Sequence, residues 1–382
     1  MLNWVLCAFS LSFIGLGLLT FFRAPTLFTW KLAIVGGEFG HWFAAGALLF
    51  AIVLGALVGM GRTGGLNVLT LFGFTLAFIL LANPMVRSWW ISRTLPGELK
   101  LAFGTASASE LPFSFTRLWT GGSAHRVPSR TLVFSEDHGQ KLSMDFYPAS
   151  SGKSAPCVIA IHGGGWDGGD RTQLPGINEL LALRGYAVAT IDYRLAPAAV
   201  WPAQREDTLA ALRYLQAHAL ELNIDGQRFV LLGRSAGGQI AVTTAYEAHE
   251  PAICGVVSLY GPHDMLFAWQ CGKENDVLNS MLLLKQYLGG TPQTAPSNFE
   301  SASSYFQVDK SVPPTLLMHG EIDTLVWNKQ SERLASRLAE NGVPHHFMSL
   351  PWGVHAFDFN LNGPSGQLTT YTLEYFLSAV TK

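Results

Sequence analysis

Charged residues are distributed very unevenly along this chain of 382 residues, and this limits what its first part can fold into. The chain has 25 Lys or Arg and 27 Asp or Glu residues, yet residues 1–86 contain only Arg23, Lys31, Glu38 and Arg62. Residues 2–22, 41–61 and 63–86 lack formal charge. Each is long enough to cross a hydrocarbon layer, which takes about 20 helical residues. We therefore expect residues 1–86 to form a transmembrane segment of three helices in a lipid bilayer.

The Lys and Arg residues that flank these stretches favour one orientation, since an excess of positive charge marks the cytoplasmic side of a membrane. If all three stretches cross, one side receives only Arg62 and the terminal amine. The other side receives Arg23, Lys31, Arg87, Arg93 and Lys100. The sequence therefore predicts a multi-pass membrane protein whose remaining residues face the cytoplasm. With two crossings instead of three, the N-terminus and the rest of the chain would lie on the same side.

The composition changes after residue 86. Residues 87–128 are interpreted as a linker, because they combine Trp89-Trp90, a pair suited to the membrane interface, with tracts rich in Gly, Ser and Thr. From residue 129 to 382, eight β-rich runs alternate with helical patterns, which predicts an α/β domain with a mostly parallel sheet and flanking helices. Residues 262–312 separate two expected strands by too much chain for a plain loop, so we expect a cap insertion there.

A sharp turn that presents a serine is predicted at Gly233-Arg234-Ser235-Ala236-Gly237. This sequence follows an apolar strand and precedes a helix-compatible run, which is the context of a nucleophile elbow. Small residues must flank the serine because the turn is so tight. The GxSxG pattern alone is a weak signal in a chain with 39 glycines, and a simple Gly-rich turn is the alternative.

A second glycine-rich turn is more specific. His162-Gly163-Gly164-Gly165-Trp166 stands directly after an expected buried strand. Residues without side chains let backbone N–H groups approach a substrate oxygen, and such donors stabilise an oxyanion in acyl transfer. A phosphate-binding loop is the competing interpretation, but neither a following Lys-Ser/Thr nor GxGxxG spacing is present.

A serine nucleophile needs a histidine that takes its proton and an acid that orients this histidine. His355 lies in a loop after the last expected strand, whereas His345 and His346 lie at the start of that strand. Asp323 follows the preceding strand, and Glu321 is the rival acid. The order Ser235, Asp323, His355 matches the Ser…Asp…His order of α/β-hydrolases.

Together these motifs resemble those of a known family. From residue 141 onward the chain resembles α/β-hydrolase esterases of the hormone-sensitive-lipase-like and bacterial feruloyl-esterase-like (BD-FAE) groups. The resemblance covers about two thirds of the chain. The motifs that carry it are His162–Trp166, Asp192-Tyr193-Arg194-Leu195-Ala196-Pro197, Gly233–Gly238, Pro314–Asp323 and His355-Ala356-Phe357.

The resemblance implies roles for individual residues. Ser235 would be the nucleophile, with Asp323 and His355 as its partners. The backbone N–H groups of Gly164, Gly165 and Ala236 would form the oxyanion hole. His162 would brace the glycine loop, and Gly163, Gly233 and Gly237 would support the two turns. Arg234 departs from the family pattern, so it is expected either to pair with a carboxylate such as Glu206 or Asp207, or to attract an anionic substrate in the cleft.

The sequence therefore predicts a membrane-tethered serine hydrolase that cleaves a small-molecule or lipid-like carboxylic ester through an acyl-enzyme intermediate. No metal or cofactor is expected. A net charge of −2 offers no basic surplus for nucleic-acid binding. A kynurenine-formamidase-like amide hydrolase and an inactive hydrolase fold that acts as a membrane scaffold are the alternatives.

Overall fold

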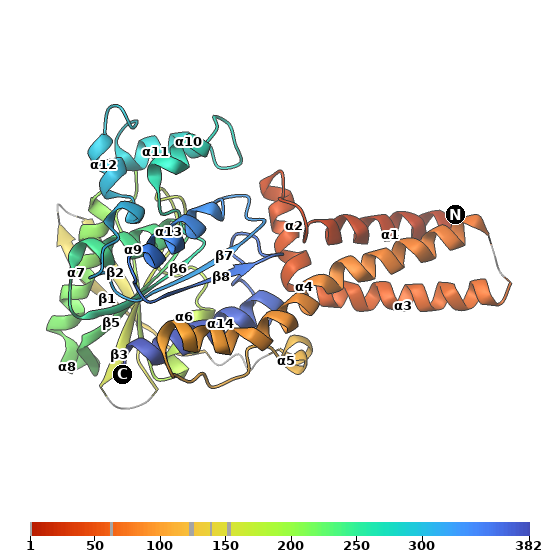
Figure 1. Ribbon diagram of the computed structural model, residues 1–382, viewed down its shortest axis with the longest axis horizontal. Coiled ribbons are helices and arrows are strands. Elements are labelled where there is room, and N and C mark those ends of the chain that lie inside the picture. The colour runs from red at the N-terminus through yellow and green to blue at the C-terminus, as the bar shows by residue number, and fades with distance from the viewer. Residues whose placement is uncertain (1, 62–63, 122–125, 138–139, 151–153) are drawn as a thin grey trace.

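A bundle of apolar helices projects from an α/β domain in the computed structural model (Figure 1). The structure describes residues 2–61, 64–121, 126–137, 140–150 and 154–382. Arg62, one of the charges that favour the expected orientation, lies outside the described residues. Residue 63, the expected start of the third helix, and part of the predicted linker also lie outside them.

The α/β domain contains one eight-stranded sheet with the strand order β1-β2-β4-β3-β5-β6-β7-β8. The pairs β1–β2 and β2–β4 are antiparallel. The remaining pairs, from β4–β3 to β7–β8 in this order, are parallel. This confirms the expected mostly parallel eight-stranded sheet. The strands are β1 (Arg130–Asp137), β2 (Gln140–Tyr147), β3 (Ala155–Ile161), β4 (Ala187–Ile191), β5 (Ile224–Arg234), β6 (Ile253–Leu259), β7 (Thr315–Gly320) and β8 (His345–Leu350).

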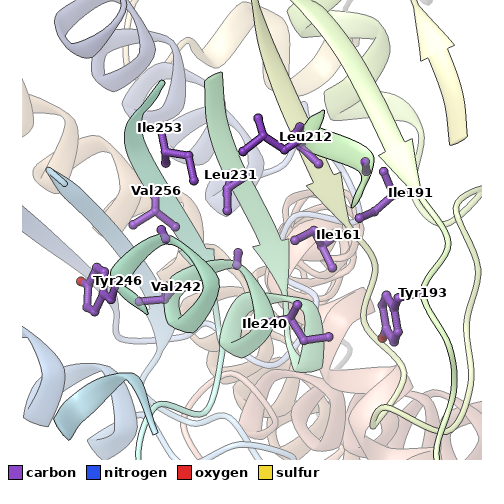
Figure 2. Packing of buried hydrophobic residues seen from close by; sticks show 14 of the residues in the cluster. Ile161, Ile191, Tyr193, Leu212, Leu231, Ile240, Val242, Tyr246, Ile253 and Val256 are labelled. Atoms are coloured by element: carbon purple, nitrogen blue, oxygen red, sulfur yellow. The ribbon is translucent and has the colours of Figure 1, made fainter. Parts of the chain in front are cut away.

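Both faces of the sheet are buried, because successive side chains of a strand point to opposite faces and helices cover each face. Ile159 and Leu231 belong to the apolar cluster on one face, and Val158 and Leu232 belong to the cluster on the other. Figure 2 shows Leu231 of β5 in the first cluster, with Ile240 of α9. The flanking helices are α6 (Gly176–Leu183), α7 (Ala203–Ala217), α8 (Ala219–Leu222), α9 (Ala236–Ala248), α13 (Lys329–Glu340) and α14 (Pro364–Val380).

The segment expected to form a cap holds four short helices between β6 and β7. Figure 1 shows three of them, α10 to α12, together on one side of the sheet. The four are α10 (Met265–Cys271), α11 (Ser280–Leu288), α12 (Pro296–Ser301) and the 3₁₀ helix η1 (Ser304–Gln307). That this insertion acts as a cap stays a prediction.

The bundle consists of α1 (Leu2–Leu18), α3 (Gly40–Gly59) and the first part of α4 (Gly65–Phe103). Glycines let these helices approach closely, since a Cβ on Gly73 of α4 would lie 2.6 Å from the Ser10 hydroxyl of α1. Two helices, α3 and α4, are long and apolar enough to cross a membrane. The 17-residue α1 is shorter, so the predicted count of three spanning helices is not confirmed.

Helix α4 extends well past residue 86, into the segment interpreted as a linker. It ends at Phe103, where Gly104 adopts a φ of 79° at the C-cap. Leu95 and Leu99, one helical turn apart, are fully buried in the core cluster that also contains α14 residues. The helix continues because this apolar stripe packs on the α/β domain. The remaining predicted linker includes the short helix α5 (Phe115–Thr120).

The sequence does not predict the helix α2 (Leu27–Glu38), which connects α1 to α3. It begins with a capping box, because the Thr26 side chain accepts a hydrogen bond from the Thr29 amide and the Thr29 side chain accepts one from the Thr26 amide. Figure 1 shows α2 at the end of the bundle that adjoins the α/β domain.

Candidate active site

Ser235 stands at a strained turn between β5 and α9. Its φ of 54° and ψ of −121° are rare for a residue with a side chain. A Cβ on Gly233 would lie 2.0 Å from the carbonyl oxygen of Gly237, and a Cβ on Gly237 would lie 2.3 Å from that of Ile161. The turn therefore requires glycine on both sides of Ser235, as the elbow interpretation predicts. Ala236 is the first residue of α9, where N–H groups have no acceptor within the helix.

The glycine loop after β3 lies beside this turn. A Cβ on Gly163 would lie 3.1 Å from the Ser235 Cβ atom, so the loop and the serine are in direct proximity. Gly164 has a φ of 127°, and a Cβ there would lie 2.2 Å from the carbonyl oxygen of Gly168. Gly164, Gly165 and Ala236 line the same pocket as Ser235. Their predicted role as oxyanion donors is compatible with this arrangement and stays a prediction.

His162 contacts the glycine loop that it is predicted to brace. Its Nδ1–H donates to the carbonyl oxygen of Gly163 at 2.8 Å, and its ring stacks on Tyr193 with centroids 4.2 Å apart. Gly163 donates its N–H to the Gln173 side chain at 2.9 Å. Burial lowers the pKa of His162, which favours the neutral ring.

The structure brings His355 and Asp323 together. The Nδ1–H of His355 donates to Oδ2 of Asp323 at 2.7 Å, and both side chains are almost fully buried. The other carboxylate oxygen of Asp323 accepts the amides of Leu325 and Val326 at 2.8 and 2.9 Å. Both His355 and Asp323 line the pocket that contains Ser235. The rival acid Glu321 is exposed and bonds Ser349 instead.

The electrostatics of this pair favour an ionised acid. Burial alone would raise the pKa of Asp323, but the charge of His355 and hydrogen bonds from His319 and His355 outweigh burial and hold it well below its ordinary value. A carboxylate that remains charged can orient the His355 ring and stabilise its protonated form. His345 and His346 remain at the start of β8, as the sequence predicts.

Arg234 pairs with a carboxylate other than the two expected from the sequence. Its Nε–H donates to Asp358 at 2.6 Å, and both side chains are buried. Glu206 and Asp207 bond Arg205 and Arg194 instead. The expectation of a carboxylate partner is correct, but the two named partners are wrong. The loop after β8 brings Asp358 next to Arg234, whereas Glu206 and Asp207 of α7 pair with other arginines.

Two further residues near the site, Tyr260 and Trp30, are not predicted from the sequence. Tyr260 donates its hydroxyl to Asp358 at 2.6 Å and packs its ring against His355, with centroids 4.4 Å apart. Trp30 of α2 donates its indole N–H to the carbonyl oxygen of His355 at 3.0 Å. The closeness of Asp358 to the His355 motif is the one sequence signal that could have found part of this network.

The pocket has a volume of about 670 Å³. Phe267, Leu283 and Leu284 of the insertion between β6 and β7 line this pocket, as does Trp327. Trp166 of the glycine loop stacks on Tyr287 of α11 with centroids 4.4 Å apart, which fixes the insertion to the loop. Within the described residues no group of three or more His, Cys, Asp or Glu residues could hold a metal ion.

The mostly parallel sheet, the strained serine turn and the His–Asp pair that lines the same pocket define an α/β-hydrolase. Residues 144–338, just over half of the chain, match the family described as BD-FAE. The chain belongs to the BD-FAE family.

Curated relatives and solved structures agree with this family. Esterase LipC of Mycobacterium tuberculosis is 27% identical over 277 residues, which cover 68% of each chain. The probable carboxylic ester hydrolase LipM of the same organism is 28% identical over 243 residues, 59% of this chain and 55% of its own length. The chain thus spans about two thirds of the first relative and about half of the second.

Among solved structures, a bacterial heroin esterase is 26% identical, covers 67% of this chain and 87% of its own, and has a TM-score of 0.56. A fungal esterase from Rhizomucor miehei, 23% identical with a TM-score of 0.58, covers 67% of this chain and 84% of its own and shares the fold. These similarities support a carboxylic ester hydrolase of the α/β-hydrolase fold.

Proposed function

We propose that the protein is a membrane-anchored carboxylic ester hydrolase in which Ser235 forms an acyl-enzyme. The observation that carries this proposal is the 2.7 Å hydrogen bond between His355 and Asp323 in the same pocket as the strained Ser235. The esterase relatives support ester substrates, and the pocket residues support the serine mechanism.

Each step of the mechanism uses a residue of this pocket. The Ser235 oxygen attacks the ester carbonyl carbon while Nε2 of His355 takes the hydroxyl proton. The backbone N–H groups of Gly164, Gly165 and Ala236 stabilise the oxyanion that forms. The C–O bond to the alcohol then breaks as His355 returns the proton to the leaving oxygen. Water attacks the acyl-Ser235 ester with His355 again as base, which releases the acid and regenerates the serine.

Membrane anchoring is proposed from the surface of the N-terminal bundle. Leu49, Ile52 and Phe72 are each more than half exposed on α3 and α4. An apolar surface of this kind is costly in water and favourable in a bilayer. The amino-terminal end of α1 and the α/β domain lie at opposite ends of the bundle (Figure 1), as three crossings require. The Lys and Arg balance then favours a cytoplasmic α/β domain, which a phosphatase or green fluorescent protein fusion after Lys382 would test.

The proposed chemistry is tested with the full-length protein and short p-nitrophenyl esters. The parent should hydrolyse them, and Ser235→Ala should lose about 10⁴-fold or more of kcat/KM. Equal rates for the parent and S235A would contradict the nucleophile assignment. Turnover of N-formylkynurenine by the same preparation, at a rate above every ester, would replace the ester by an amide substrate.

A further inference from the structure

One wall of the active-site pocket is built by the N-terminal part of the chain, outside the α/β domain. Arg23, Leu27 and Trp30 line the same pocket as Ser235 and His355. Leu27 is about half exposed, whereas Ser235 is partly buried and His355 is buried. The pocket is therefore completed by α2 and by the segment that leads into it.

This wall is attached to the loop that carries His355. The Trp30 indole donates to the His355 carbonyl oxygen at 3.0 Å. Ala24 and Ala33 are buried in one small cluster with Val354, the residue before His355. At the other end of α2, Glu38 accepts the amide of Ser365 in the first turn of α14. Contacts at one end hold α2 against the His355 loop, and the contact at the other end holds it against α14.

The same wall lies at the end of the apolar bundle. α1 ends at Leu18, a few residues before Arg23, and α3 begins at Gly40, directly after α2. Aromatic side chains that flank this level, Phe22, Phe28 and Trp42, are each more than half exposed. Aromatic and cationic residues at the ends of apolar helices mark the membrane–water interface. The pocket wall is therefore at the depth of that interface whenever the bundle is inserted in a bilayer.

The side chains of this pocket wall suit an amphiphilic substrate at the membrane interface. Leu27, Trp30 and Phe267 offer apolar surface. The guanidinium of Arg23 lies 5.5 Å from the ring centre of Trp327, and both residues line the pocket, so one cation lies among these apolar side chains. A long-chain ester has the same division between a polar carboxyl region and an apolar chain.

We propose that the substrate is an ester amphiphile resident in the bilayer, and that it enters the pocket laterally along Leu27 and Trp30 of α2. This inference rests on the proposed ester hydrolase function. An enzyme with this arrangement takes its substrate from the membrane surface and releases the acid or alcohol product there.

The test uses the full-length protein in phosphatidylcholine vesicles and two esters with the same fluorescent alcohol, 4-methylumbelliferyl acetate and 4-methylumbelliferyl oleate. The oleate ester is presented in the vesicle membrane or bound to serum albumin outside. The parent should turn over the vesicle-embedded oleate ester faster than the albumin-bound one. Equal rates from the two presentations, or cleavage of acetate without oleate, would overturn lateral entry.

A charged substitution in the pocket wall formed by α2 tests the proposed entry path directly. Leu27→Glu should lower the ratio of the oleate rate to the acetate rate by about tenfold or more, because an unpaired carboxylate on an apolar path is costly. Leu220→Glu, on the far exposed helix α8, is the matched control and should leave the ratio unchanged. An unchanged ratio in L27E would overturn the proposal. Failure of the parent on both esters would instead contradict the ester hydrolase function itself.

Discussion

The two sides of the pocket are held by different kinds of contact. On the side of the α/β domain, backbone atoms approach so closely that a Cβ on Gly233 would lie 2.0 Å from a carbonyl oxygen. On the side of α2, the contacts with the His355 loop are one indole hydrogen bond and a small apolar cluster, between segments 325 positions apart in the sequence. The first side is fixed by the backbone itself, and the second depends on side chains that single substitutions can remove.

The largest loss is expected on the backbone-fixed side, at the acid of the pair. Asp323→Asn keeps the size of the side chain but removes the charge that orients and stabilises protonated His355, so kcat should fall by about 10⁴-fold. Steady-state hydrolysis of a p-nitrophenyl ester measures this loss. Glu321→Gln is the matched control and should stay within about twofold of the parent. A full-rate D323N enzyme would mean that another acid serves His355.

The ion pair beneath the elbow should matter for stability more than for chemistry. Asp358→Asn leaves the buried Arg234 guanidinium without a charged partner, which should lower the free energy of unfolding by about 3 kcal/mol or more. Chemical unfolding in detergent measures the change. Glu340→Gln, in the exposed pair with Arg337, should cost less than about 1 kcal/mol. Similar costs in the two variants would show that burial of the first pair has no energetic consequence.

The contact between α2 and α14 should make stability depend on pH. Burial raises the pKa of Glu38 from 4.5 to about 8. Above pH 4.5 the unfolded chain releases this proton while the folded protein retains it, so the stability contribution of Glu38 falls as pH rises until about pH 8.

Melting temperatures of the parent and of Glu38→Gln between pH 4.5 and pH 8 test this sign. The parent should lose stability across the range, and E38Q should lose less because its amide does not titrate. Parallel curves for the two proteins would assign the pH dependence to other groups.

The smallest effect is expected from the single hydrogen bond between α2 and the His355 loop. Trp30→Phe keeps the aromatic ring and removes the donor to the His355 carbonyl, so stability should fall by about 1 kcal/mol with only a several-fold loss of kcat. Trp90→Phe, at an exposed position of α4, is the matched control. A loss in W30F as large as that in D323N would mean that α2 contributes directly to the chemistry.

Contacts fixed by the backbone can be predicted from the sequence, whereas side-chain contacts between distant segments cannot. The glycine patterns around Ser235 and after β3 identify both turns, because tight backbone approaches admit few residue types. The order Ser235, Asp323, His355 likewise predicts the pairing of Asp323 with His355, which the structure shows. Side-chain pairing across distant segments has no such signature, so Asp358 as the partner of Arg234 and Trp30 as a contact of His355 do not follow from the sequence.

Helix boundaries in the N-terminal part are also poorly predicted from the sequence. The uncharged stretches 2–22, 41–61 and 63–86 predict apolar helices, but not where each one ends. α4 continues to Phe103 because Leu95 and Leu99 find buried positions on the α/β domain. α2 forms because Thr26 and Thr29 cap it and the domain supplies its partners. Both outcomes depend on packing between regions that the local pattern does not encode.

Covalent labelling tests whether Ser235 is an activated nucleophile in a membrane-bound enzyme. Isolated membranes that contain the full-length protein are treated with a fluorophosphonate probe, and the adduct is located by mass spectrometry of peptides. We expect one adduct, on Ser235, that is recovered in the membrane fraction and is absent from S235A. An adduct on another residue, or no adduct on a protein that remains folded, would contradict the assignment of Ser235 as the nucleophile.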